Sequence, residues 1–294
     1  HGIGGDITID GPGGPVTLTP FRVKHGNIDS LGYRMKFGVI APSTNTSVQP
    51  EFDDMRPVGV TNHFSRIIIP DTPVHNDEDF NNLVMGIRAA TMDAIDAVKT
   101  CSPGAMVMGM SAETFWDGKE RADKLQAEIM ERAGMPVAMG SDACMNALKC
   151  FGDIKKIAVI TPYMPVGDQQ VERYFTDCGY EVVQVKGLKC KSPMLIAHET
   201  EKTLRDAINE VNDPSVEAII QAGTNLAMAR LAAEAEKWLK KPVIAINTAT
   251  YWYAMRANGM RDQIDGFGSL MTDFTELPKS YLDMMGSQGV SLTG

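Results

Sequence analysis

The chain has 294 residues, of which 44% are hydrophobic, and it carries a formal net charge of −9 at pH 7. Such a chain can bury two cores of ordinary size, and its acidic balance excludes nucleic acid as an expected partner, since phosphate binding needs a surplus of Lys and Arg on one face. No apolar run approaches the roughly 18 residues of a membrane span, and the first residues show no signal pattern, so we expect a cytoplasmic protein with no membrane partner.

Residues 1–35 differ in composition from the rest of the chain, because glycines alternate with short β-prone pieces such as Ile7–Asp10 and Pro15–Thr19. We expect an N-terminal arm or hairpin outside the main fold. Two interpretations stay open for it: a partly ordered terminus, and an arm that crosses onto a second copy of the chain to form a homo-oligomer.

The rest of the chain contains an internal repeat of three apolar segments in the same order. Each segment resembles a buried strand that opens into small or polar residues. The pairs are Lys36–Pro42 with Lys156–Pro162, Gly104–Ser111 with Val216–Gly223, which sets Met110 opposite Ala222, and Pro136-Val137 with Pro242-Val243. Two halves related by a pseudo-twofold axis would present their polar turns at one cleft, because parallel sheets bind ligands at the carboxyl ends of their strands.

Helices alternate with these strands, as shown by apolar residues that recur at three and four positions from Leu83 to Val98. The predicted fold class is α/β, with two pseudo-symmetric doubly wound domains of parallel strands and an active site between them. We expect the first half at 36–152, joined by the C-terminal segment 253–294, and the second at 153–252. Further strands are expected at Arg66–Pro70, Val137–Met139, Glu181–Lys186 and Val243–Ile246, and helices at Lys119–Ala133, Asp168–Cys178, Glu199–Val211, Ala227–Leu239 and Asp273–Met285.

Motifs for nucleotides and metals are missing from the sequence. It contains no GxGxxG after the first strand, no GxxxxGK[ST], and no CxxC among its five cysteines. His63 and His75 lie near Asp71 and Asp77, but without the helical spacing of two histidines this cluster is interpreted as a solvated loop. We therefore expect no cofactor and no metal.

Several segments together resemble one known family, the arylmalonate decarboxylase and maleate isomerase branch of the aspartate/glutamate racemase superfamily. The resemblance runs from about Phe37 to about Gly268 and rests on Gly38–Thr46, Met110–Gly118, Tyr163 after Ile160–Pro162, Ala222–Thr224 and Asn247–Trp252 with Met255-Arg256. It implies an enzyme that binds a small carboxylate between two pseudo-symmetric domains and uses neither a metal nor an organic cofactor. Lyase or isomerase chemistry is implied as well.

The resemblance also implies a cage of hydroxyl and backbone donors around a substrate carboxylate. An enediolate intermediate needs such preorganised donors in a dry pocket. Other roles stay open, since Ser111 and Thr224 could only cap helices, Tyr163 could be a packed aromatic, and Asn45 could form a turn. The matching positions are Pro42, Ser43, Ser111, Ala112, Tyr163, Gly223 and Thr224, and Asn45 matches an asparagine that grips carboxylate in maleate isomerases.

The chain departs from this family at its cysteines. Racemases and isomerases of the superfamily carry one cysteine on each half, and the decarboxylase keeps the second as its acid, but the matching residues here are Met110 and Ala222. Neither can transfer a proton. Glu113, beside two aromatic residues, is the predicted replacement, although it could instead be a first-turn helix acid. Cys190 is a further candidate in a loop that lines the cleft of relatives.

These features predict a cofactor-independent lyase that decarboxylates a malonate-type acid. An isomerase or elimination lyase that acts on a maleate-like dicarboxylate with Glu113 or Tyr163 as base is one alternative. A hydrolase with Ser111 as nucleophile is another, although no His–carboxylate relay surrounds it. The loss of both thiols also leaves open a carboxylate-binding protein without catalysis.

Overall fold

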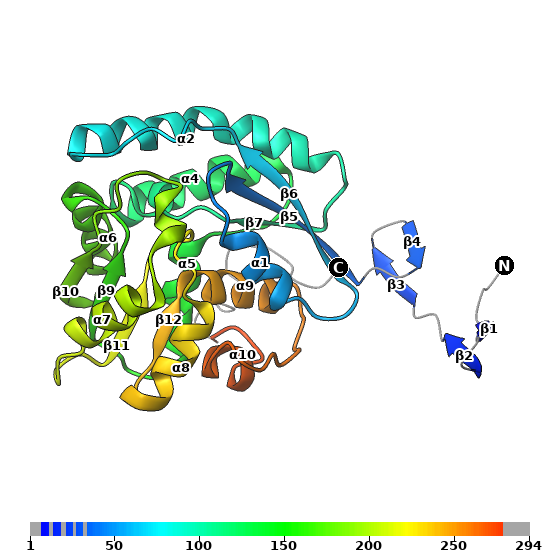
Figure 1. Ribbon diagram of the computed structural model, residues 1–294. Coiled ribbons are helices and arrows are strands. Elements are labelled where there is room, and N and C mark those ends of the chain that lie inside the picture. Colours follow the sequence, from blue (N-terminus) through cyan, green and yellow to red (C-terminus); the bar gives the residue numbers. More distant parts are fainter. Residues whose placement is uncertain (1–6, 12–13, 19–21, 26–27, 32–33, 279–294) are drawn as a thin grey trace.

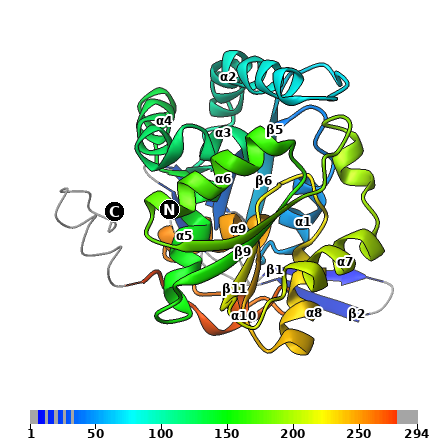
Figure 2. The ribbon, with the colours of Figure 1, turned by 90° about the vertical axis from the view of Figure 1, so that its left-hand side faces the viewer.

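The computed structural model describes residues 7–11, 14–18, 22–25, 28–31 and 34–278. Two four-stranded parallel sheets form its centre, and helices cover both (Figure 1, Figure 2). The first sheet has the order β6-β5-β7-β8 and the second the order β10-β9-β11-β12, so each half repeats the same topology. The prediction of two pseudo-symmetric doubly wound domains is confirmed. The strands are β5 (Met35–Pro42), β6 (Val60–Ile67), β7 (Ala105–Met108), β8 (Val137–Ala138), β9 (Lys156–Thr161), β10 (Glu181–Gly187), β11 (Ala218–Gln221) and β12 (Val243–Ala245).

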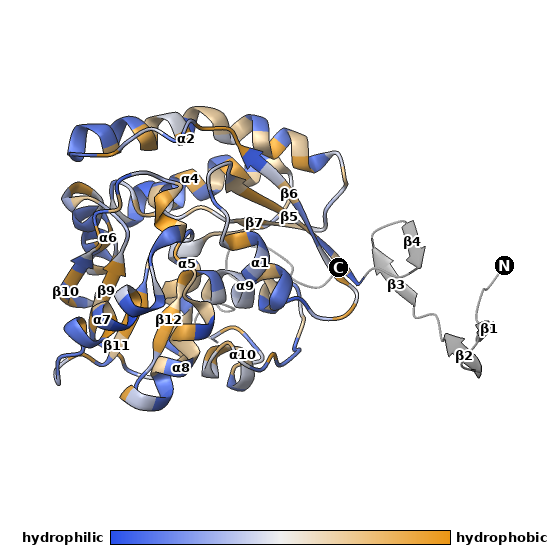
Figure 3. Ribbon diagram, in the orientation of Figure 1, coloured by the Kyte–Doolittle hydropathy of each residue, from blue (hydrophilic) through white to orange (hydrophobic). Residues whose placement is uncertain are grey.

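Several helices lie in the segments where the sequence predicts them. The longest, α2 (Asp77–Lys99), begins where the side chain of Asn76 accepts the N–H of Asp79 at 2.9 Å, and its apolar stripe is buried. Orange and blue residues alternate on the helices in Figure 3, whereas the central strands are mostly orange. The other helices are α1 (Val48–Asp54), α3 (Ala112–Phe115), α4 (Gly118–Ala133), α5 (Gly140–Cys150), α6 (Pro165–Asp177), α7 (Glu201–Val211), α8 (Ala229–Leu239), α9 (Ile246–Ala257), α10 (Ser269–Asp273) and the 3₁₀ helix η1 (Leu195–His198).

The sheet register corrects the alignment of the two halves by one residue. Phe37 pairs with Ala105 in the first sheet, and Ile157 pairs with Ala218 in the second. The N–H of Gly109 donates to Ile40 at 2.7 Å, as the N–H of Ala222 donates to Ile160 at 2.8 Å. The counterpart of Ala222 is therefore Gly109, not Met110. By the same register, Ser111 is the counterpart of Thr224.

Three other expectations are wrong. The second strand is Val60–Ile67, not Arg66–Pro70, because this edge strand is only half-buried along most of its length and carries polar residues that the sequence gives no reason to place in a sheet. His63 lies in that strand and hydrogen bonds to Thr61 at 2.9 Å, so it does not belong to a loop. The last helix of the described residues ends at Asp273, and residues 274–278 are not helical. The remainder of the expected helix, to Met285, lies outside the described residues.

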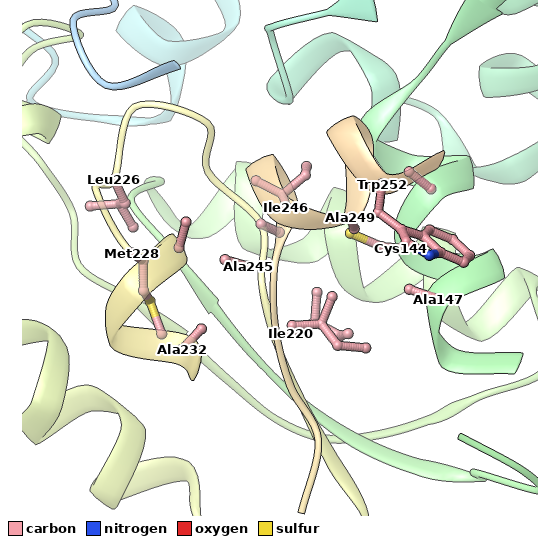
Figure 4. Close-up of a cluster of buried hydrophobic side chains, with 14 of the residues drawn as sticks. Cys144, Ala147, Ile220, Leu226, Met228, Ala232, Ala245, Ile246, Ala249 and Trp252 are labelled. Atoms are coloured by element: carbon pink, nitrogen blue, oxygen red, sulfur yellow. The ribbon is translucent and has the colours of Figure 1, made fainter. Parts of the chain in front are cut away.

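The two halves are joined by a core in which α5 packs against α9. Trp252 of α9 is fully buried, and Figure 4 shows it with Ala249 and with Cys144 of α5. Cys144 is therefore a core residue. α9 also packs against α1, β7 and β8 of the first half and against α8 and β12 of the second.

The described parts of the N-terminal segment form two antiparallel hairpins. β1 (Ile7–Gly11) pairs with β2 (Gly14–Leu18), and β3 (Arg22–His25) pairs with β4 (Ile28–Leu31). None of these strands joins a four-stranded sheet, in keeping with an arm outside the repeat. A role of this arm in oligomerisation stays a prediction. Among the described residues, no helix is long and apolar enough to span a membrane.

Candidate functional site

A cavity of about 60 Å³ lies where the carboxyl ends of β5, β7, β9 and β11 converge. This is room for several water molecules, and hence for a small acid. Turns from both halves supply its lining, but no residue of the turns that follow β8 and β12 lines it, so the third pair of repeated segments does not contribute. Seven predicted site residues line the cavity, namely Pro42, Asn45, Ser111, Ala112, Tyr163, Gly223 and Thr224.

Two hydroxyls related by the pseudo-twofold axis meet beside the cavity. Ser111 Oγ and Thr224 Oγ1 are 3.5 Å apart, and Ser111 Oγ accepts the backbone N–H of Thr224 at 3.1 Å. Both residues are buried. The α3 helix that Ser111 precedes receives no hydrogen bond from its side chain, so the hydroxyl is not used as a cap.

Tyr163 and Asn45 each bond to one of these hydroxyls. Tyr163 Oη lies 2.7 Å from Ser111 Oγ, and Asn45 Nδ2 donates to Thr224 Oγ1 at 3.2 Å. Burial raises the pKa of the Tyr163 phenol, which therefore stays protonated near neutral pH. The phenol and the amide are neutral groups that can turn a donor toward a carboxylate.

Two glycines allow the chain to approach closely around Tyr163. A Cβ at Gly223 would lie 2.4 Å from the ring of Pro162, and a Cβ at Gly167 would lie 2.7 Å from Tyr163 Cβ. A side chain at Gly223 would push apart the turns after β9 and β11, and a side chain at Gly167 would push α6 away from Tyr163. The Tyr163 ring also packs on Phe80, with the ring centroids 5.2 Å apart.

Asn225 is a site residue that the sequence interpretation missed. Its Oδ1 accepts the N–H groups of Thr46 at 2.9 Å and Ser47 at 3.3 Å, and its Nδ2 donates to the carbonyl of Pro193 at 2.8 Å. It thereby ties the turn after β11 to the loop after β5 and to the segment that follows β10. Its place directly behind Ala222–Thr224 was the available signal.

Three predicted site residues do not line the cavity. The hydroxyl of Ser43 donates to the carbonyl of Ile69 at 3.0 Å and closes the loop there. The thiol of Cys190 donates to Glu199 at 3.4 Å, and burial raises the pKa of this thiol.

Glu113 is the third of these residues. It is buried and accepts the Arg88 Nε–H at 2.6 Å, while its Oε2 has no partner among the described residues. Burial raises the pKa of Glu113, and Arg88 opposes that effect. Its carboxylate is thus directed to a half-exposed arginine.

Six apolar side chains also line the cavity, and we call them the apolar wall. No residue that lines the cavity in the described part of the chain has a charged side chain. The described residues also contain no group of three or more His, Cys, Asp and Glu that could hold a metal ion. The arrangement suits an acid with a polar head and a hydrophobic substituent. The wall consists of Ile69, Phe80, Leu83, Ile87, Met110 and Ile196.

Comparisons with known proteins agree with this fold. A family model described as arylmalonate decarboxylase matches residues 74–271. Maleate isomerases of Pseudomonas putida and Alcaligenes faecalis are 22% and 24% identical over 250 residues, which cover 81% of this chain and 97% and 96% of theirs.

Solved structures are similar as well. The maleate isomerase of Pseudomonas putida S16, solved with maleate, superposes with a TM-score of 0.74 at 20% identity, covering 81% of this chain and 97% of that one. A crystal structure of arylmalonate decarboxylase superposes with a TM-score of 0.63 at 17% identity, covering 80% of this chain and 98% of that one. At these identities the likeness establishes the fold alone.

Proposed function

The chain belongs to the arylmalonate decarboxylase family, and on that premise we propose that it is a cofactor-independent lyase that removes CO₂ from a small malonate-type acid. The observation that carries the proposal is a cavity lined by neutral donors and by six apolar side chains, with no charged side chain among its described lining residues. An acid with two carboxylates on one carbon could place one against the donors and the other against the apolar wall. Loss of hydration at the wall would favour departure of the second carboxylate as neutral CO₂.

The neutral donors would hold the carboxylate that remains. The hydroxyls of Tyr163, Ser111 and Thr224 and the backbone N–H of Thr224 lie close together beside the cavity. In the ligand-free arrangement these groups bond to each other, and hydroxyl hydrogens can rotate toward an incoming anion. Their hydrogen bonds would strengthen as charge moves onto the carboxylate oxygens in the enediolate.

The reaction would proceed in two steps. The C–C bond to the departing carboxylate breaks, its electron pair stays on the substrate as an enediolate, and CO₂ leaves. A proton then passes to the carbon, and we assign this proton to the Tyr163 phenol, which the cavity contains and whose raised pKa keeps it protonated. Solvent would reprotonate the phenolate. Glu113 ranks below Tyr163 as a candidate proton donor, because its side chain does not line the cavity.

An isomerase or elimination lyase that acts on a maleate-like dicarboxylate is the alternative. It is motivated by the relatives that are named maleate isomerases. Two features disfavour it: a second carboxylate would face the apolar wall, and Gly109, Met110 and Ala222 provide no thiol for attack on a double bond. Tyr163 would serve poorly as a base, because burial raises its pKa.

Incubation with methylmalonate, phenylmalonate and maleate would test the proposal. Proton NMR should show the monocarboxylic acid forming from at least one malonate, with and without a chelator, and no fumarate from maleate. Conversion of maleate to fumarate alone would favour the isomerase. Thermal stabilisation by these acids without any turnover would instead indicate a binding protein.

A further inference from the structure

Glu51 connects the two halves of the molecule and has no part in the reaction proposed above. It lies on α1, and its Oε1 accepts the N–H of Ala229, the first residue of α8, at 2.9 Å. Its Oε2 accepts Nδ2 of Asn247, on α9, at 2.6 Å. The same Nδ2 donates to the carbonyl of Thr224 at 2.9 Å. A single amide therefore connects the Glu51 carboxylate to the turn that supplies Thr224 to the cavity.

The orientation of the Asn247 amide depends on Glu51. Its NH₂ group donates to both a carboxylate and a carbonyl, and both of these groups can only accept. The reversed amide would place its oxygen against two acceptor oxygens. In the orientation found, Asn247 Oδ1 is buried and has no partner among the described residues. The amide thus holds the Thr224 carbonyl only while Glu51 acts as an acceptor.

We propose that Glu51 is a positioning residue for the carboxylate cage, and that its ionised form holds the Thr224 turn in the conformation that binds substrate. The inference rests on the proposed function, because it assumes that the cavity binds a carboxylate. When Glu51 is protonated, its O–H becomes a donor and Asn247 Oδ1 is the unused acceptor of the neighbouring amide. An amide that turns to accept this O–H withdraws its own N–H from Thr224.

The surroundings of Glu51 place this change near neutral pH. Burial raises the pKa of Glu51 to about 7, and Asp54 on the same helix acts in the same direction, while the donors Asn247 and Ala229 oppose it. Arg230 on α8 also faces this region, but it pairs with Asp54 at 2.8 Å and stacks on Phe267. From α9 the group that contacts Glu51 is the neutral Asn247.

Protons have a path to Glu51 that does not cross the catalytic cavity. Glu51, Asp54 and Arg230 line a separate, solvent-open cavity of about 380 Å³. Bound substrate therefore need not block exchange. Carboxylate affinity should rise with pH as Glu51 ionises, while the substrate carboxylates themselves are already ionised.

Binding of phenylacetate, a monocarboxylate that cannot lose CO₂ by this reaction, tests the inference by calorimetry from about pH 5.5 to about pH 8.5. We expect the wild-type Kd to fall about tenfold across this range, as expected for one hydrogen bond to a charged group. In Glu51→Gln one acceptor oxygen must serve two donors, so the variant should bind about tenfold more weakly above neutral pH and lose the pH dependence.

Asp54→Asn is the matched control, since it removes a carboxylate from the same helix that does not contact Asn247. Its Kd should still fall with rising pH by about as much as in the wild type, with the midpoint at a lower pH because Asp54 no longer raises the pKa of Glu51. The side-chain NH₂ resonances of Asn247 provide a readout independent of ligand, and they should shift near neutral pH in the wild type but not in Glu51→Gln.

Phenylacetate that binds the wild type with a pH-independent Kd would overturn the inference and leave the proposed function intact. A wild type that binds neither phenylacetate nor malonates at any pH would overturn both. The wild-type profile needs no variant, so the test holds even when Glu51→Gln does not fold.

Discussion

Beside the cavity, a loop of each half hydrogen bonds to a hydroxyl of the other half, and the two loops use different functional groups. The loop after β5 in the first half reaches the Thr224 hydroxyl of the second with an amide, that of Asn45. The loop after β9 in the second half reaches the Ser111 hydroxyl of the first with a phenol, that of Tyr163. The topology is symmetric, but only one of the two contacts carries a group that can transfer a proton. We therefore expect the proton-transfer step to depend on a residue of the second half, Tyr163.

The side chains that hold the two loops in place also differ between the halves. Arg66 donates to the carbonyl of Asn45 at 2.9 Å and so holds the first loop with a cation. The N–H of Tyr163 donates to Thr161 Oγ1 at 3.1 Å, and Thr161 in turn bonds to the carboxylate of Asp168. The two halves share one strand order, but their loops at the site are held by side chains of opposite charge, Arg66 and Asp168.

Tyr163→Phe should produce the largest effect, because it removes both a cage donor and the assigned acid while leaving the ring packed on Phe80. We expect kcat/KM for the best malonate substrate to fall about 10²–10³-fold. Tyr251→Phe is the matched control, since its phenol bonds to Asn62 and not to the cavity. A Tyr163→Phe variant with more than half of the wild-type activity would contradict the assignment.

Ser111→Ala and Thr224→Val test the symmetric pair of hydroxyls. Ser111 contacts Tyr163 and the N–H of Thr224, whereas the Thr224 side chain contacts Asn45 and Ser111. We therefore expect a loss in kcat/KM of about 10–100-fold for Ser111→Ala and a smaller loss for Thr224→Val. Thr91→Val, which removes a buried hydroxyl on α2, controls for folding. Additive losses in Ser111→Ala and Tyr163→Phe, measured as a double-mutant cycle, would argue against a shared ligand.

Glu113→Gln separates the sequence interpretation from the structural one. Since Glu113 is paired with Arg88 and does not line the cavity, we expect kcat to stay within about threefold of the wild type. Steady-state kinetics and a thermal melt would measure activity and stability side by side. A folded Glu113→Gln variant with a loss near 10²-fold would restore Glu113 as the proton donor.

The two pseudo-symmetric halves with parallel sheets could be predicted from sequence because the apolar segments recur and parallel strands need crossovers. The register could not, and this led to Met110 in place of Gly109 as the counterpart of Ala222. Turn residues such as Ser111 and Tyr163 were identified from the family resemblance, whose matching segments lie at or after the ends of predicted strands. Glu51 was missed because its importance comes from contacts across the two halves, which local pattern does not encode. Asn225 was missed although it directly follows the matched segment Ala222–Thr224.

Asp168→Asn should have the smallest effect on activity and a distinct effect on stability. Burial raises the pKa of Asp168 from 3.8 to about 6. The folded state therefore holds this proton more tightly than the unfolded state, so the contribution of Asp168 is complete below pH 3.8, declines as pH rises, and is lost above about pH 6.

Asparagine keeps an oxygen that can accept the Thr161 hydroxyl, so kcat should change little, but it carries no titrating proton. As the pH rises from 3.8 to about 6, the free energy of unfolding of Asp168→Asn should therefore increase relative to that of the wild type, by at most about 1.4 kcal/mol per pH unit. Urea unfolding at several pH values measures this slope, and Glu172→Gln, on the exposed part of the same helix, controls for the loss of one acid. If the two curves of unfolding free energy against pH run parallel, the Asp168 carboxyl has the same pKa in the folded and unfolded chains. The environment of Asp168 would then not raise its pKa, and the two halves would differ at these positions only in the residues that hold each loop.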